Sequence, residues 1–138
     1  MIILDTNVLS EPLRPRPSQR VVDWLDAQAP EALFLTTISL AELFAGIETL
    51  PAGRRRAALK EALSTQIRGL FGERILAFDV LAAEAFAQVN ASAVKQGNRI
   101  PFADAAIASI AKAHGFVVAT RNLRDFKGTG VAVLDPWA

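Results

Sequence analysis

The chain contains no cysteine in its 138 residues and only one histidine, His114. The lack of cysteine excludes disulfides, thiolate metal sites and cysteine nucleophiles. A single histidine gives little support to a Ser-His-Asp or Cys-His mechanism. His114 directly precedes Gly115, where we expect a helix to end and where a cation suits the helix dipole, so we interpret it as structural. The sequence also lacks a GxxxxGK[ST] phosphate loop, and no GxGxxG follows a strand.

Long apolar runs are also missing. No uninterrupted apolar segment approaches the roughly 18 residues of a membrane span. The apolar run Met1–Leu4 has no cationic stretch ahead of it and is too short for a signal peptide. We therefore expect a soluble, cytoplasmic protein without a membrane partner.

Neither sign of charge is in excess, since 15 Lys and Arg stand against 14 Asp and Glu. The sequence pI of about 8.2 does not by itself indicate a nucleic-acid-binding protein. Most of the cations are nevertheless arginine, which suits bidentate phosphate contacts better than lysine. They gather in three clusters, namely Arg14, Arg16 and Arg20, then Arg54–Arg56, then Arg121, Arg124 and Lys127. The alternative for each cluster is an ordinary solvated helix end or turn.

The length and an apolar content of 51% predict one domain, residues 1–138, with a substantial core. Short apolar runs alternate with segments of helical pattern. This order predicts an α/β fold with a mostly parallel central sheet of about five strands and helices on both faces. The expected strands are Met1–Leu4, Leu33–Thr36, Ile75–Phe78, Phe116–Thr120 and Val131–Leu134.

Capping and stop signals predict where the helices begin and end. Ser18 is expected to cap a helix over about Gln19–Gln28, and Ser39 to open a helix that carries Glu42. A third helix is expected from Arg54 to about Leu70, and a fourth, capped by Asp79, is expected to run to about Gln96. The last helix is expected to begin at Pro101 and to end at Gly115.

Three acids stand in apolar surroundings: Asp5 ends the first apolar run, and Glu42 and Asp104 lie within two others. Burying a lone carboxylate costs several kcal/mol unless it is paired, hydrogen-bonded or bound to metal. In a parallel sheet the strand carboxyl ends share one edge, and sites form there. Asp5 follows a strand, and the helices carrying Glu42 and Asp104 begin near that edge. We therefore expect the three acids to meet around a hard divalent cation.

Each acid also has a plainer interpretation. Asp5 is a good N-cap for a short following helix. Ser39-x-x-Glu42 matches a capping box, in which the glutamate bonds back to the Ser39 amide. Asp104 lies in a first helical turn, where the dipole favours an acid.

Four sequence blocks together resemble PIN-domain ribonucleases, and most closely the VapC and FitB toxins of bacterial type II toxin–antitoxin pairs. The likeness covers nearly the whole chain, in order and with similar spacing. The blocks are Ile3-Leu4-Asp5-Thr6-Asn7, Ser39-x-x-Glu42-Leu43-x-x-Gly46-Ile47, Asp104-Ala105-x-Ile107-Ala108 and Thr120-Arg121-Asn122-x-x-Asp125-Phe126.

The resemblance implies a PIN-like parallel-sheet domain that hydrolyses RNA with Mg²⁺ or Mn²⁺. It also implies a homodimer that a small antitoxin neutralises in a larger complex. Asp5, Glu42 and Asp104 would be the catalytic, metal-binding acids. An apolar groove for an antitoxin helix or strand is expected near them, with a second core cluster as the alternative; the residues expected to line it are Leu9, Leu13, Phe44 and Ile47.

Many members of that family carry a fourth acid where this chain has Asn122. Either Asp125 replaces that acid or Asn122 holds a metal-bound water. Further possible site residues are Thr6, Asn7 and Thr120, and possible RNA phosphate contacts are Arg121 and Arg124.

Two other functions are weighed against this one. A non-catalytic, magnesium-binding receiver-like domain needs adjacent acids after its first strand and a lysine after its last, whereas here Asp5 stands alone and Arg121 follows Thr120. Asp79 does follow a strand, but it is interpreted as a helix cap. A DNA-directed or structure-specific nuclease of the same fold is the second alternative.

Overall fold

The computed structural model describes residues 1–138 and is built on a central sheet of five parallel strands. The strand order is β3-β2-β1-β4-β5, so the first strand lies in the middle and the chain passes once, between β3 and β4, from one half of the sheet to the other. The strands are β1 (Ile2–Leu4), β2 (Leu33–Thr36), β3 (Ile75–Leu76), β4 (Val117–Ala119) and β5 (Val133–Leu134).

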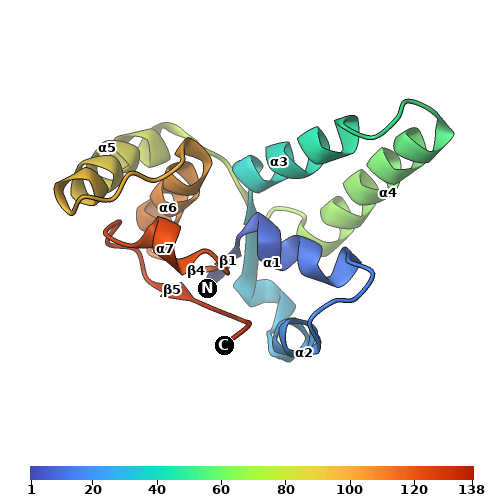
Figure 1. Cartoon of the computed structure of the whole chain (residues 1–138), viewed down its shortest axis with the longest axis horizontal. Helices are drawn as coiled ribbons and strands as arrows, with labels where there is room; N and C mark the ends of the chain where they lie inside the picture. The colour runs from blue at the N-terminus through green and yellow to red at the C-terminus, as the bar shows by residue number, and fades with distance from the viewer.

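Helices cover both faces of this sheet, with α5, α6 and α7 on one side and α1 to α4 on the other (Figure 1). Helices α3 and α4 form a hairpin that projects from the body of the molecule (Figure 1). The α-helices are α1 (Thr6–Ser10), α2 (Gln19–Ala27), α3 (Thr37–Glu48), α4 (Arg54–Phe71), α5 (Val80–Lys95), α6 (Phe102–His114) and α7 (Leu123–Phe126), with 3-10 turns η1 (Glu11–Leu13) and η2 (Pro30–Ala32). None of the helices is long and apolar enough to cross a membrane.

The alternation of side chains along the strands divides the core into two clusters. Ile3 and Val118 point to the face covered by α5 and α6. Their neighbours Leu4 and Ala119 point to the opposite face, where they pack with residues of α1, α2 and α4. All four are buried. The three-residue strands β1 and β4 are therefore apolar throughout, as expected of strands covered on both sides.

The predicted architecture is confirmed, with shorter strands at the sheet edges. The third and fifth strands contain two residues each, Ile75–Leu76 and Val133–Leu134, where runs of four were expected. Asp79 caps α5 as predicted, since its Oδ1 accepts a hydrogen bond from the Ala82 amide at 3.0 Å. Gly115 ends α6 with φ +70°, a left-handed conformation that favours glycine.

The prediction that Ser39 opens a helix with a capping box is wrong. Helix α3 begins at Thr37, and its N-cap is Thr36, whose Oγ1 accepts a hydrogen bond from the Ser39 amide at 3.1 Å. Thr36 is the last strand residue and keeps an extended backbone, so its hydroxyl accepts the Ser39 amide that a capping box would have given to Glu42. The Glu42 side chain therefore does not cap α3.

The cap predicted at Ser18 is also formed differently. Ser18 occupies the N-cap position of α2, but its side chain makes no capping hydrogen bond. Its amide N–H instead donates to Oε1 of Glu11 at 3.1 Å, while Oε2 of Glu11 lies 3.3 Å from Nη1 of Arg14. Glu11 is buried, so this carboxylate fixes the proline-rich segment between η1 and α2.

We expect Ile110→Ala to lower the free energy of unfolding by about 2–5 kcal/mol, because it leaves a cavity in a close-packed core. Ile110 is fully buried in α6. The matched control is Val94→Ala on α5, whose side chain is 54% exposed; a change within about 0.5 kcal/mol is expected there. Urea denaturation measures both, and equal losses in the two variants would contradict this assignment of the core.

Candidate active site at the carboxyl edge of the sheet

The site begins where β1 and β4 end side by side. Asp5 follows β1, and the hydroxyl of Thr120, which follows β4, donates to Asp5 Oδ2 at 2.7 Å. The backbone N–H of Thr6 donates to Asp5 Oδ1 at 2.8 Å, which makes Asp5 the N-cap of α1. Asp5 is only 3% exposed. The capping role expected of Asp5 is thus real, and the second carboxylate oxygen is held by Thr120.

Burial and charge both act on Asp5. Burial raises the pKa of its carboxyl above the ordinary value, and the charge of Glu42 adds to that rise. The hydrogen bonds from Thr120 and Thr6 act in the opposite direction, because they favour the ionised form. A further weak donor is Nδ2 of Asn7, which lies 3.3 Å from Asp5 Oδ2.

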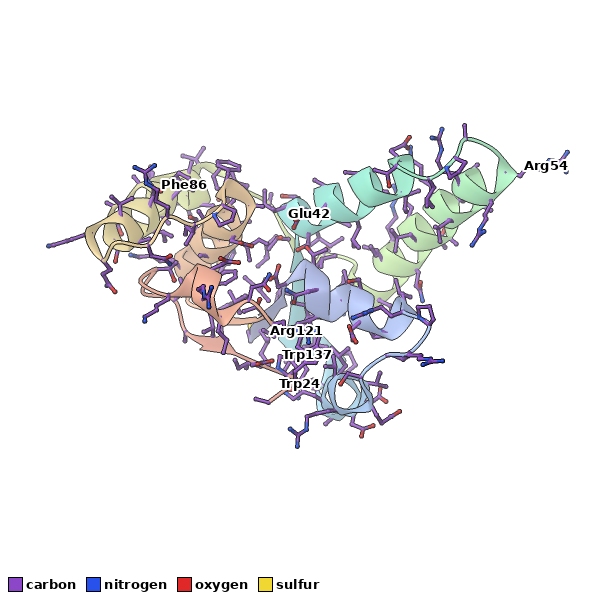
Figure 2. The ribbon with its side chains drawn as sticks, viewed as in Figure 1. Trp24, Glu42, Arg54, Phe86, Arg121 and Trp137 are labelled. Atoms are coloured by element: carbon purple, nitrogen blue, oxygen red, sulfur yellow. The ribbon has the colours of Figure 1, made fainter.

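Glu42 reaches this edge from α3, which follows the neighbouring strand β2. Its side chain is exposed and lies at the body end of the projecting hairpin (Figure 2). The hydroxyl of Thr6 donates to Glu42 Oε1 at 2.8 Å. Thr6 therefore contacts one acid through its backbone and another through its side chain.

Asp104 lies half-buried in the first turn of α6. Burial, followed by the charges of Asp5, Asp125 and Glu42, raises the pKa of its carboxyl to about 6, and no hydrogen bond offsets the rise. The three acids singled out in the sequence thus lie within electrostatic reach of one another. Asp125, in α7, belongs to the same group.

The loop after β4 closes one side of the site. The Arg121 amide donates to Asn7 Oδ1 at 3.3 Å, and the Asn122 amide donates to the Thr120 hydroxyl at 3.0 Å. The Asn122 side chain is exposed. Of the two residues considered for the missing fourth acid, Asp125 contributes charge at Asp104, while Asn122 holds the loop through its backbone.

The two arginines that follow β4, Arg121 and Arg124, differ in their surroundings. The guanidinium carbon of Arg121 lies 5.2 Å from the ring centre of Trp137, a cation–π arrangement that holds the arginine against the C-terminal segment (Figure 2). Arg124, in α7, is exposed and has no ion-pair partner. No local signal in the sequence indicates the contact with Trp137, because 16 positions separate it from Arg121.

Two other contributors, Thr36 and Ser39, were missed as site residues. Both are fully buried, and the Ser39 hydroxyl lies 2.9 Å from that of Thr6. The available signal was the run of hydroxyl residues directly after a buried strand, at the edge where sites form.

The donor chemistry of the site suits a hard cation. The available groups are carboxylate, hydroxyl and amide oxygens, and none of the acids Asp5, Glu42, Asp104 and Asp125 forms an ion pair with lysine or arginine. No three His, Cys, Asp or Glu side chains come close enough to enclose a metal ion by themselves. Mg²⁺ does not need such a cage, since it keeps several waters and takes one or two carboxylates together with substrate phosphate.

An apolar groove of about 410 Å³ lies on the face covered by α1 to α4. Leu9 and Leu13 line it as predicted, and its floor is the second core cluster. The prediction was wrong for the other two residues. Phe44 lines a separate, polar depression beside α4, and Ile47 is buried. Phe44 is one position further round α3 than Leu43, which lines the groove, whereas Ile47 lies one turn along the same side as Leu43 and is covered.

Comparison with known proteins places this geometry in a family. The PIN domain family model matches residues 2–131. The chain is 47% identical to the plasmid stability protein StbB of Pseudomonas syringae pv. tomato and 46% identical to toxin FitB of Neisseria gonorrhoeae, in each case over 99% of both chains. It is 41% identical to the VapC ribonuclease Y4jK of Sinorhizobium fredii, over 99% of this chain and 98% of that protein.

The fold agrees with these relationships. The structure of FitAB bound to an IR36 DNA fragment superimposes with a TM-score of 0.94 at 44% identity, covering 100% of this chain and 96% of that one. The chain therefore belongs to the PIN domain family, as the sequence blocks indicated.

The raised pKa of Asp104 gives stability a defined pH dependence. Its value in the fold, about 6, lies above the ordinary 3.8, so the folded protein binds this proton more tightly than the unfolded chain. Between these values the contribution of Asp104 to stability falls as pH rises. We expect Asp104→Asn to stabilise the metal-free protein at pH 7.5 and to have little effect at pH 4.

Urea denaturation in EDTA at the two pH values measures this effect. Glu73→Gln, at an exposed acid in the turn after α4, is the control and should change stability little at either pH. A stabilisation by Asp104→Asn that is equal at pH 4 and pH 7.5 would show that charge is not its cause.

Proposed function

We propose that this protein is a metal-dependent endoribonuclease toxin that hydrolyses RNA phosphodiester bonds. The observation that carries the proposal is a group of acids without cationic partners at the carboxyl edge of a parallel sheet. Such a group is destabilising in the free protein and is explained if it holds a divalent ion. The names of two relatives, toxin FitB and VapC ribonuclease Y4jK, support the same activity.

Asp5 and Asp104 would hold the ion, Mg²⁺ or Mn²⁺, through carboxylate oxygens. When bound, the metal lowers the pKa of water and offsets charge on the scissile phosphate. Thr120 keeps the Asp5 carboxylate in place through its 2.7 Å hydrogen bond. Glu42, which is exposed at this edge of the sheet, would orient the attacking water and accept its proton.

Asp125 would supply the fourth carboxylate, which many members of the family carry at the position that is Asn122 here. Its charge already acts on Asp104, so it lies on the correct side of the site. Asn122 would keep the loop in position through its amide hydrogen bond to Thr120, with its side chain free to bind a water.

Cleavage of a labelled RNA by the purified protein, with Mg²⁺ or Mn²⁺ and with EDTA as the control, tests the proposed function. The same assay on single- and double-stranded DNA addresses the alternative of a DNA-directed nuclease. RNA left intact with either metal would overturn the proposal, and cleavage of DNA alone would favour that alternative.

We expect Asp5→Asn and Asp104→Asn each to reduce RNA cleavage by at least about 100-fold, since each removes a proposed metal ligand. The fold should persist. An asparagine at position 5 keeps one acceptor oxygen for the Thr6 amide, and its NH2 group can donate to the Thr120 hydroxyl in place of accepting from it. The change at Asp104 removes an unfavourable charge. Circular dichroism checks the fold, and Glu73→Gln serves as the control. Full activity in either variant would remove that residue from the mechanism.

We expect Arg124→Gln to weaken RNA binding and to reduce the slope of log K against log salt by about 1, as for the loss of one phosphate contact. Arg54→Gln is the matched control, because Arg54 lies at the far tip of the α3–α4 hairpin, away from Glu42 (Figure 2). Fluorescence anisotropy over a salt series in EDTA measures binding without cleavage. An unchanged slope would assign Arg124 to ordinary surface.

We further propose that a small antitoxin neutralises the protein through the apolar groove. Leu13 and Leu70 line this groove with 63% and 59% of their surface exposed, which is unusual for leucines on a face with its own core. A helix or strand with apolar side chains would cover them. The groove borders α1, which also carries Thr6, so its occupant lies near the acids.

A homodimer that joins a larger complex with the antitoxin is the assembly we propose. The surface available for it lies at the N-terminal ends of α5 and α6, where Val80, Leu81 and Phe102 are each more than 60% exposed. Phe102 also packs with Phe78 and Phe86, with ring centres 6.2 and 5.3 Å away, which makes this apolar surface rigid.

A further inference from the structure

Three hydroxyl groups lead from the buried end of β2 to the Glu42 carboxylate. The Thr36 hydroxyl lies 3.5 Å from that of Ser39, and the Ser39 hydroxyl lies 2.9 Å from that of Thr6. The Thr6 hydroxyl is in turn 2.8 Å from Glu42 Oε1. Thr36 and Ser39 are fully buried, whereas Glu42 is exposed. These contacts thus connect buried residues of the core to the exposed side chain of Glu42.

The direction of these hydrogen bonds follows from the number of protons. A hydroxyl has one proton to donate, and a carboxylate can only accept. Thr6 therefore donates to Glu42 and must accept from Ser39. The Ser39 hydroxyl in turn accepts from Thr36, whose own lone pair receives the Ser39 amide at 3.1 Å. All the donors point the same way, and such chains strengthen their terminal bond.

We propose that Thr6 is a positioning residue for Glu42: its hydroxyl, oriented by Ser39, holds the Glu42 carboxylate toward the other acids. The Glu42 carboxylate has no other hydrogen bond and no ion-pair partner. An exposed glutamate without such a contact samples many rotamers, and few of them face the site. The inference rests on the proposed function, since it assigns Glu42 a task for which orientation matters.

Thr6 can be altered without disturbing what its backbone does. Asp5 caps α1 through the Thr6 amide N–H, which every substitution except proline retains. Thr6→Val keeps the shape of the side chain and removes only the hydroxyl, while Thr6→Ser retains the hydroxyl. Ser39→Ala removes the group that orients Thr6 and leaves the Thr6 hydroxyl in place.

In single-turnover cleavage of a labelled RNA oligonucleotide with Mn²⁺, we expect Thr6→Val to lower the maximal rate by about 10- to 100-fold, the range for loss of a group that orients a site residue. The RNA concentration at half-maximal rate should change little, because the arginines are untouched. Thr6→Ser should restore the rate to within a few-fold, and Ser39→Ala should fall between the two.

Thr49→Val is the matched control, because it removes a hydroxyl bonded to the Gly46 carbonyl near the other end of α3. Its cleavage rate should equal that of the unsubstituted protein. A Thr6→Val variant with an unchanged rate would overturn the proposal. A rate loss that Thr6→Ser does not restore would also overturn it, since it would show that Thr6 acts through packing alone.

A second measurement does not depend on nuclease activity. Crystal structures of the unsubstituted protein and of Thr6→Val should show one Glu42 rotamer in the former and several, or weak side-chain density, in the latter. A single, unchanged Glu42 rotamer in Thr6→Val would refute the positioning role even if the protein cleaves RNA. Absence of cleavage by the unsubstituted protein, with Glu42 released in Thr6→Val, would instead reject the proposed function and retain the positioning role.

Discussion

The site depends on the parallel pairing of β1 with both of its neighbours. Ile3 pairs with Phe34 on β2 and with Val118 on β4, so all three strands run the same way and end at the same edge. Asp5, Thr36 and Thr120 are the residues at which these strands end or which directly follow them. An antiparallel neighbour would have placed its last residue at the opposite edge. The backbone pairing of the strands thus brings Thr36 and Thr120, which are more than 30 and more than 110 positions away in sequence, to the edge where Asp5 lies. Thr120 then hydrogen-bonds to Asp5 there.

The negative charge at this edge of the sheet lowers the stability of the folded protein when no cation is bound. Asp5 and Asp104 both have a raised pKa, chiefly because they are buried, and each is raised further by other acids. The folded chain therefore tolerates carboxylates that weaken it when no cation is present. Hydrogen bonds relieve this cost at Asp5 but not at Asp104. Such unrelieved charge is typical of a site that is completed by a ligand.

Local signals in the sequence were sufficient wherever one element determined the outcome. The cap at Asp79, the helix end at Gly115 and the apolar strands follow from residues within a few positions of each other. The error at Ser39 arose because the helix begins two residues earlier, so that Thr36 accepts the Ser39 amide that a capping box would have given to Glu42. The sequence also indicated that Asp5, Glu42 and Asp104 would lie near one another, because their apolar neighbours made them conspicuous. Their role at a metal ion stays a prediction.

Other features could not be predicted, because they depend on how elements pack in three dimensions. The stacking of Arg121 on Trp137 joins two loops that the sheet brings together. The hydroxyl contacts of Ser39 and Thr6 depend on the distance between α3 and α1. Phe44 and Ile47 were assigned to the groove because they are near Glu42 in sequence, but Phe44 lies round the helix from the groove-lining Leu43, and Ile47 is covered by packing.

The distribution of aromatic residues makes the two layers optically different. Both tryptophans, Trp24 and Trp137, pack against the core cluster under α1, α2 and α4. In the cluster under α5 and α6, the aromatic residues are all phenylalanine. Intrinsic tryptophan emission consequently reports one half of the molecule. Fraying of α5 would leave the tryptophan emission unchanged in a thermal melt, whereas loss of the contact between Trp137 and Arg121 would change it.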